Sequence, residues 1–363
     1  MIKKGILLLL MVSLFLQAEN NRRIKVLHVT FHEGCKNEFI GVANALGLDL
    51  TSWFVQELER EIGPGFWEGT YVGNEIYNVG PRRAKRVWDK HKDFFNQFDV
   101  IVTSDTVPLS RIFLQNGWEK PLLIWICNRF DYAHPGGGED HFPDAAYYDL
   151  LRKATTMKNV YFISYTEYEH EYARRRGVEV GRRVIKPGSS QESYTEPFRY
   201  KVPSHIDKAN TLFIFPRIYP SQRDIVRNAL ATRGIQTWSE DGIATHEIKG
   251  FKGVIYFPYN LSTLALFDHT IQGIVRFIPT KEFLRSTGFI RDYSLKNNLD
   301  MCEFYQDEFK DILVYFDSWD DLKQKIESTD YELLRRKNIE FGKKYQDITL
   351  SKWSTLFNEL VKN

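Results

Sequence analysis

The sequence predicts an α/β protein of two domains, each built around a parallel β-sheet. Short apolar runs of strand length alternate with segments of helical periodicity along most of the chain, which is typical of parallel sheets. A length of 363 residues exceeds one ordinary hydrophobic core and favours two domains of about 150 residues each. The alternation stops once, at residues 189–208, which are rich in serine, proline and charge, and then restarts. We therefore expect two α/β domains joined by a linker.

The first array of strands and helices follows residue 22 and ends near residue 190. Its β-rich runs are expected to form strands at residues 24–31, 98–104, 121–127 and 159–164, and a segment at residues 184–188 closes the array. Segments with apolar residues at helical spacing follow three of the runs, at residues 36–46, 109–113 and 167–176. The basic run at residues 81–86 is expected to be the solvated face of a helix that continues through Trp88.

The second array covers residues 209–345 and repeats the same alternation. Strands are expected at residues 211–215, 235–238, 253–258, 273–279 and 312–316. Helices are expected at residues 222–232, 263–272, 320–328 and 331–345. A last amphipathic helix at residues 350–361 lies in a tail, residues 346–363, which is expected to pack back on the first domain.

Composition indicates a globular protein and argues against a dedicated nucleic-acid binder. Apolar residues make up 43% of the chain and charged residues 26%, which is enough for sizeable cores. The formal net charge of +2 is far below the basic bias of most nucleic-acid-binding domains. No nucleic-acid partner is therefore expected.

Residues 1–18 have the order of a secretory signal peptide. Lys3 and Lys4 precede a predominantly apolar run from Ile6 to Leu16, and Ala18 provides a small residue for cleavage. The run is shorter than the roughly 20 residues needed to cross a bilayer. We expect export or entry into the secretory pathway. An uncleaved signal-anchor, and with it a peripheral association with a membrane, remains the alternative.

Missing motifs exclude several enzyme classes. The sequence contains no G-x-G-x-x-G motif after a strand and no P-loop, nucleophile-elbow or zinc-protease signature. These absences argue against a dehydrogenase, a P-loop kinase, a serine hydrolase and a zincin. The three cysteines are distant and odd in number, which predicts no disulfide framework. No Asp-x-Asp pair is present to hold a metal on a diphosphate. We expect neither a metal nor another cofactor.

Two places in the second array could bind a diphosphate. Arg217 follows an apolar strand, and Arg223 lies near the start of the next helix. A cation at the carboxyl end of a parallel strand, close to a helix N-terminus, suits a phosphate group. The polar turn at residues 259–263 precedes a helix in the same way, with Ser262 and Thr263 as candidate N-caps. The alternative is that these groups are a surface arginine and simple helix caps.

These segments resemble the C-terminal domain of glycosyltransferases of the GT-B fold, in particular the retaining group that includes glycogen and sucrose-phosphate synthases. The similar segments are residues 213–223, 251–268 with 273–280, and 315–322 with the final helix. The resemblance implies two Rossmann-like domains facing across a cleft. It also implies that Tyr259, Asn260, Leu261, Ser262 and Thr263 contact the donor diphosphate and that Asp268 binds its ribose. The sequence departs from that family where Gln222 replaces a lysine and Asn260 replaces the first of two glutamates.

Acceptor and catalytic groups are expected on the first domain. His32, Glu33 and Gly34 end its first strand, and Arg129, Asp131 and His134 follow its third, at the edge where α/β proteins place their sites. Asp131, Glu33 or His32 could act as the base if the reaction inverts the sugar, whereas a retaining reaction could use the donor phosphate. Gly34, Arg129 and His134 are candidates for acceptor binding, and residues 136–143 could form a lid.

The sequence therefore predicts a metal-independent, hexosyltransferase-like enzyme that uses a nucleotide-sugar donor and a carbohydrate or glycoconjugate acceptor. The alternative from another class is an exported two-lobe ligand-binding protein without catalysis. A sugar-nucleotide epimerase or phosphorylase on the same scaffold is a third hypothesis.

Overall fold

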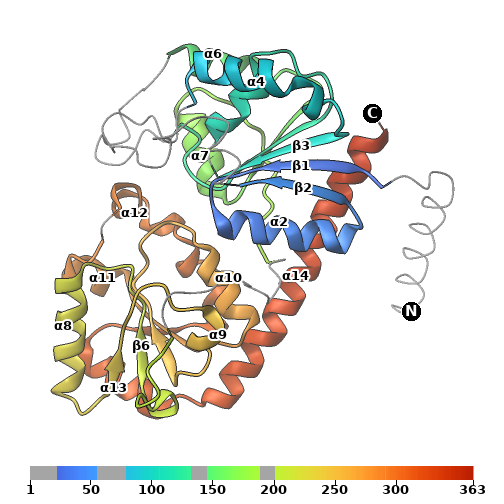
Figure 1. Ribbon diagram of the computed structural model, residues 1–363. Coiled ribbons are helices and arrows are strands. Elements are labelled where there is room, and N and C mark those ends of the chain that lie inside the picture. The colour runs from blue at the N-terminus through green and yellow to red at the C-terminus, as the bar shows by residue number, and fades with distance from the viewer. Residues whose placement is uncertain are drawn as a thin grey trace.

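The computed structural model describes residues 23–54, 79–105, 107–131, 145–188, 201–290 and 292–362 (Figure 1). The predicted signal peptide at residues 1–18 lies outside the described residues. So do His134, the predicted lid at residues 136–143 and most of the predicted linker.

The first domain is a five-stranded parallel sheet in the order β2-β1-β3-β4-β5. Its central strands are almost entirely apolar and fully buried, which is typical of a parallel sheet covered by helices on both faces. The strands are β1 (Lys25–Val29), β2 (Asp49–Trp53), β3 (Val100–Ser104), β4 (Leu122–Ile126) and β5 (Val160–Ser164). The helices are α2 (Glu33–Leu46), α4 (Pro81–Phe95), the 3-10 turn η1 (Val107–Ser110), α5 (Arg111–Leu114), α6 (Ala145–Ala154) and α7 (Glu167–Arg175).

The second domain is also a five-stranded parallel sheet, in the order β10-β9-β8-β6-β7. Its strands are β6 (Leu212–Ile214), β7 (Thr237–Trp238), β8 (Gly253–Ile255), β9 (Arg276–Pro279) and β10 (Val314–Phe316). Its helices are α8 (Pro220–Ala231), α9 (Thr245–Ile248), α10 (Leu264–Ile271), α11 (Lys281–Thr287), α12 (Tyr293–Asn297), α13 (Trp319–Ser328) and α14 (Tyr331–Lys362), with 3-10 turns η2 (Lys208–Asn210), η3 (Leu299–Met301), η4 (Glu303–Tyr305) and η5 (Asp307–Ile312).

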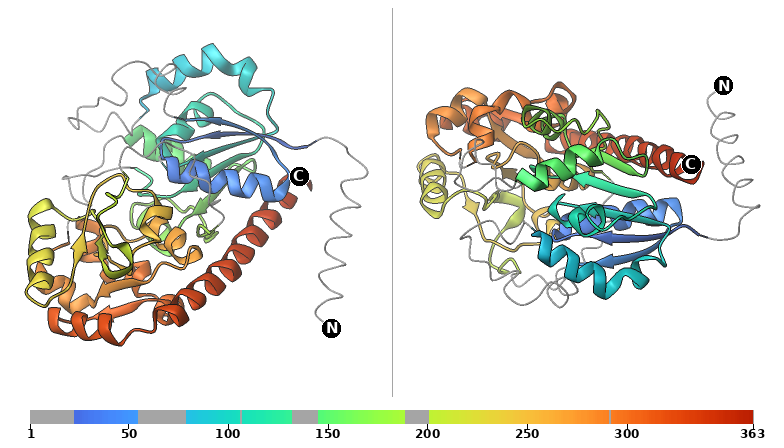
Figure 2. Two further views of the ribbon diagram at one scale, coloured as in Figure 1. Left: turned by 60° about the horizontal axis from the view of Figure 1, so that its bottom comes forward. Right: turned by 90° about the horizontal axis from the view of Figure 1, so that it is seen from above.

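Helix α14 connects the two domains along one side of the molecule (Figures 1 and 2). It begins on the second domain, where it packs against α10, and ends on the first. Trp353 is fully buried there, with its ring 5.6 Å from that of Phe39 and 5.4 Å from that of Trp125. The prediction that the C-terminal helix crosses back is therefore confirmed.

The structure corrects one helix prediction and adds a strand. Residues 331–345 and 350–361 form one continuous helix, because no glycine or proline lies between them. The closing segment at 184–188 makes a single bridge, between Val184 and Ser164. Strand β2 escaped prediction because it is a short, half-buried edge strand with polar residues.

Helix α4 confirms the interpretation of the basic run. Ala84, Val87 and Phe95 are buried, while Arg82, Lys85 and Arg86 are exposed. Of the helices in the described ranges, none is both long and apolar enough to span a membrane.

Candidate functional site

The two domains meet where the segments after β1 and β4 of the first sheet contact the segment between β8 and α10 of the second. We call residues 258–263 of that segment the β8–α10 loop. Gly34 in the first turn of α2 approaches Leu264 so closely that a Cβ at Gly34 would lie 2.2 Å from the Leu264 Cδ1 atom. Any larger residue at position 34 would have to displace that methyl group or separate the domains.

The β8–α10 loop is held by hydrogen bonds from both ends. The Asn260 Oδ1 atom accepts from the Leu261 backbone N–H at 2.8 Å, and the Thr263 hydroxyl lies 3.1 Å from that of Tyr256. Thr263 is the N-cap of α10, but its side chain does not cap the helix. The Thr263 side chain therefore does not occupy the N-terminus of α10, and backbone N–H groups at such an N-terminus can bind an anion.

Glu303 contacts the same loop through Ser262 and was not predicted from the sequence as a site residue. It is 2% exposed; its carboxylate accepts from the Ser262 hydroxyl at 3.2 Å and pairs with the Lys186 ammonium at 2.9 Å. Burial raises the pKa of Glu303, although Lys186 opposes the shift. Since Lys186 belongs to the first domain, this ion pair also connects the loop to the opposite side of the junction. A hollow of about 380 Å³ lies beside Lys186 and Glu303.

Arg217 and His32 come from different domains and are close enough to interact electrostatically. Arg217 is exposed after β6, with its guanidinium carbon 5.6 Å from the centre of the Tyr259 ring. His32 is the N-cap residue of α2 and keeps contact with solvent, although protein groups surround it on most sides. The positive charge of the Arg217 guanidinium lowers the pKa of the His32 imidazole. Two of the predicted site residues, one from each domain, therefore come within electrostatic reach.

The surroundings of His32 favour its charged form. Desolvation is the largest single effect and lowers its pKa, and Arg217 lowers it too, but a hydrogen bond with Cys35, the charge of the Cys35 thiolate and the charge of Asp105 together raise the pKa to about 9. Asp105 follows β3, and among the described non-glycine residues it alone has a positive φ, 65°. A residue held in this uncommon conformation beside a candidate site is typical of functional loops.

Arg223, the second predicted cation, does not join this group. Its Nη1 atom lies 3.4 Å from the Asp241 carboxylate, so an acid of its own domain already neutralises it. The acid predicted to bind ribose, Asp268, lies on α10 one turn after Leu264 and is 8% exposed. Its predicted role stays a prediction.

The predicted catalytic role of Asp131 is not supported. Its carboxylate accepts hydrogen bonds from the hydroxyls of Tyr148 and Tyr172 and lies 3.1 Å from the Arg176 guanidinium. The side chain has no exposed surface. A carboxylate with this many partners stabilises the first domain and has no access to an acceptor hydroxyl. Glu33, in the first turn of α2, is half-buried at the junction and stays a candidate base.

Glu169 is a second site residue that sequence analysis missed. It lies in the first turn of α7, is 5% exposed, and its Oε2 atom has no hydrogen-bond partner. Burial raises its pKa to about 7, Arg129 opposes the shift, and the carboxylates of Asp131 and Asp292 add to it. Its only sequence signal was an acid beside a helix start, which is also typical of an ordinary exposed glutamate.

The Glu169→Gln variant is expected to remove a pH-dependent penalty on stability. Because the folded-state pKa is raised from 4.5 to about 7, wild type loses stability as the pH rises from about 4.5 through 7. The loss amounts to about 3 kcal/mol. Relative to wild type, the variant should therefore gain stability between pH 5 and pH 8 in chemical denaturation. Glu167→Gln, an exposed change on the same helix turn, is the control. Parallel pH profiles for wild type and Glu169→Gln would contradict the assignment.

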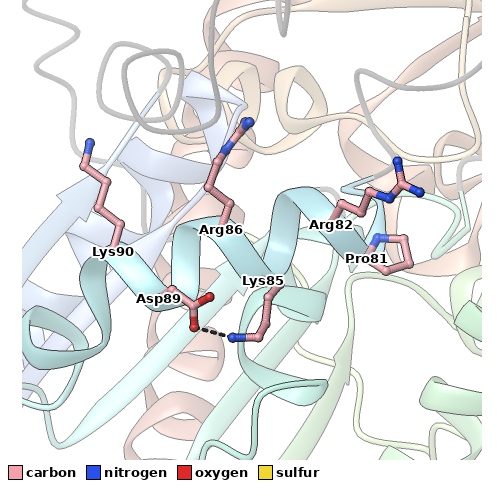
Figure 3. Close-up of a pocket in the computed structure, with 6 residues that line it drawn as sticks. All are labelled: Pro81, Arg82, Lys85, Arg86, Asp89 and Lys90. Carbon is pink, nitrogen blue, oxygen red and sulfur yellow. Dashed lines mark hydrogen bonds and ion pairs between the residues drawn. The ribbon is translucent and has the colours of Figure 1, made fainter.

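Another hollow lies far from the junction (Figure 1). It measures about 740 Å³ and is lined by Pro81, Arg82, Lys85, Arg86, Asp89 and Lys90 on the outer side of α4 (Figure 3). The lining residues that the structure describes all come from one exposed helix, so we do not regard this hollow as the functional site. Within the described ranges, no cluster of three or more histidine, cysteine, aspartate or glutamate residues could hold a metal ion.

Comparisons with known proteins bear on the fold. No protein-family model matches the sequence. No curated protein matches it either. The structure is similar to UGT89C1 of Arabidopsis thaliana in complex with quercetin, with a TM-score of 0.54 and 10% identity, over 93% of this chain and 100% of that one. The complex of UGT89C1 with UDP gives a TM-score of 0.50, also at 10% identity and over the same shares of both chains.

The glycosyltransferase SnogD from Streptomyces nogalater covers 92% of this chain and 99% of its own at 11% identity, with a TM-score of 0.46. None of these structures is named as a glycogen or sucrose-phosphate synthase, so a place in that retaining group is not established. Identities this low establish the fold alone. The chain has a GT-B type fold, with two parallel α/β domains facing each other and a C-terminal helix that returns to the first.

Proposed function

We propose that the protein is a glycosyltransferase that moves a sugar from a nucleotide-sugar donor to an acceptor hydroxyl. The observation that carries the proposal is the meeting of Arg217, the N-terminus of α10 and His32 at the junction of a GT-B type fold. A similar structure was solved with UDP, which makes UDP-sugars the first donors to test.

The donor diphosphate is proposed to bind between Arg217 and His32. At neutral pH the guanidinium carries a positive charge, and so does an imidazole whose pKa is about 9. Backbone N–H groups at the start of α10 would bind the remaining phosphate oxygens. Protein groups would thus supply the charge that a metal ion supplies elsewhere, which is why we propose a metal-independent reaction.

In the transfer step, the bond between the sugar C1 atom and the diphosphate oxygen breaks, and the electron pair stays on the diphosphate. The acceptor hydroxyl oxygen forms a new bond to C1. Its proton goes to Glu33 in an inverting reaction or to the departing phosphate in a retaining one. Arg217 and His32 would stabilise the charge that develops on the leaving group. The acceptor class proposed is a carbohydrate or glycoconjugate.

Incubation with radiolabelled UDP-, GDP- and ADP-sugars tests the proposal. Slow release of free nucleotide without an acceptor is expected for one of the donors, and it should persist in EDTA. Tight binding without any release would favour the exported ligand-binding protein instead. Neither binding nor release with any donor would overturn the proposal, and loss of release in EDTA would overturn metal independence.

A further inference from the structure

Arg129 connects the first domain to two separate segments of the second. Its Nη1 atom donates to the Asn260 Oδ1 atom at 2.9 Å, and its Nη2 atom lies 3.5 Å from the Asp292 Oδ2 atom. Arg129 is 8% exposed, and the Asp292 side chain is 12% exposed. Water screens such contacts weakly, so they are worth more than ion pairs on the open surface.

Both partners of Arg129 also fix the backbone of the second domain. The Asn260 oxygen that accepts from Arg129 is the same atom that accepts from the Leu261 N–H. The other carboxylate oxygen of Asp292 caps α12 by accepting from the Leu295 N–H at 2.7 Å. Arg129 therefore contacts the two groups that set the conformation of the β8–α10 loop and the start of α12.

We propose that Arg129 is an inter-domain latch, a positioning residue that holds the β8–α10 loop in its ligand-binding conformation only while the two domains are closed. When the domains separate, Asn260 loses this donor and the loop loses one of its supports. Donor binding and domain closure then favour each other, because each stabilises the same arrangement. The effect on a donor rests on the proposed function, whereas the effect on closure does not.

Glu169 provides a partner for Arg129 in the open arrangement. A guanidinium that loses the two contacts with Asn260 and Asp292 in a poorly solvated place carries a penalty, which would make opening costly. The free Oε2 atom of Glu169 lies within electrostatic reach of Arg129. Glu169 is therefore the nearby acid that would pair with Arg129 when the domains open and Arg129 leaves Asn260 and Asp292.

The test compares Arg129→Gln, Asn260→Ala and the double variant with wild type. UDP is the probe in calorimetry, and small-angle X-ray scattering reports domain closure. Arg129→Gln is expected to weaken UDP binding about 10-fold and to increase the radius of gyration, although Arg129 lies outside the proposed diphosphate site. The losses of UDP affinity in the double variant should be less than additive, because both single changes remove the contact between Arg129 and Asn260. Arg152→Gln, which breaks an exposed ion pair of the same domain, is the control.

Circular dichroism identifies any variant that does not fold. If Arg129→Gln does not fold, the milder variants Arg129→Lys and Asp292→Asn are measured in its place. Additive losses in the double variant, or an unchanged radius of gyration in Arg129→Gln, would overturn the latch. If wild type does not bind UDP, the proposed donor is wrong, and scattering alone decides the latch. An expanded Arg129→Gln variant would support it in that case, and an unchanged one would reject it.

Discussion

Replacement of Arg217 with alanine is expected to lower kcat/KM for the nucleotide-sugar by about 10²- to 10³-fold. The guanidinium is exposed at the end of β6, beside the Tyr259 ring and within electrostatic reach of His32. A charge-assisted hydrogen bond to a diphosphate strengthens as negative charge moves onto the leaving group, so its loss affects the transition state more than the bound donor. Initial rates of nucleotide release at several donor concentrations measure the effect.

Arg223→Ala is the matched control for this experiment. Arg223 lies six residues along the same segment but pairs with Asp241. An ion pair of this kind contributes about 1 kcal/mol or less, so kcat/KM should change less than about fivefold. A large loss of kcat/KM in Arg223→Ala, together with an active Arg217→Ala, would show that the diphosphate binds at α8 and not at the end of β6.

The order of strands and helices could be predicted because each element carries its own signal. Residues 121–127 and 211–215 are apolar and lie between polar turns, and the structure places β4 and β6 there. The polar pattern of β2 carries no such signal, since its outer edge and half-buried faces place few demands on its residue types. The continuity of α14 through residues 346–349 was not predicted, because the residue types there fit both the interior of a helix and a break between two helices.

Only the site residues that directly follow a strand could be predicted from the sequence. His32 and Arg217 follow strands, and parallel sheets place such residues at one edge. Asp131 carries the same signal, but its partners Tyr148, Tyr172 and Arg176 lie on two later helices, and nothing in the sequence pairs them. The contact between Arg129 and Asn260 joins positions 131 residues apart. Only the assembled fold shows that one candidate acceptor residue binds a candidate donor residue.

Arg276→Met is expected to destabilise the second domain by about 3–5 kcal/mol, because the change removes a fully buried cation on which other polar groups depend. The guanidinium donates to the Leu266 carbonyl at 2.5 Å, the Thr270 hydroxyl at 2.6 Å and the Asn338 Oδ1 atom at 2.8 Å. None of these three acceptors is a carboxylate, and burial lowers the pKa of Arg276 to about 9.

The three bonds join β9 to α10, which carries the proposed diphosphate site at its start, and to α14, which crosses to the other domain. Without them, the two helices keep buried acceptors that nothing satisfies. Chemical denaturation measures the loss, and Arg227→Ala is the control, because its ion pair with Asp224 is exposed and should be worth less than about 1 kcal/mol. Equal stability of the two variants would show that the packing of α10 and α14 does not depend on Arg276. A selective loss in Arg276→Met, accompanied by weaker UDP binding, would place the proposed donor site on a helix whose position depends on this buried cation.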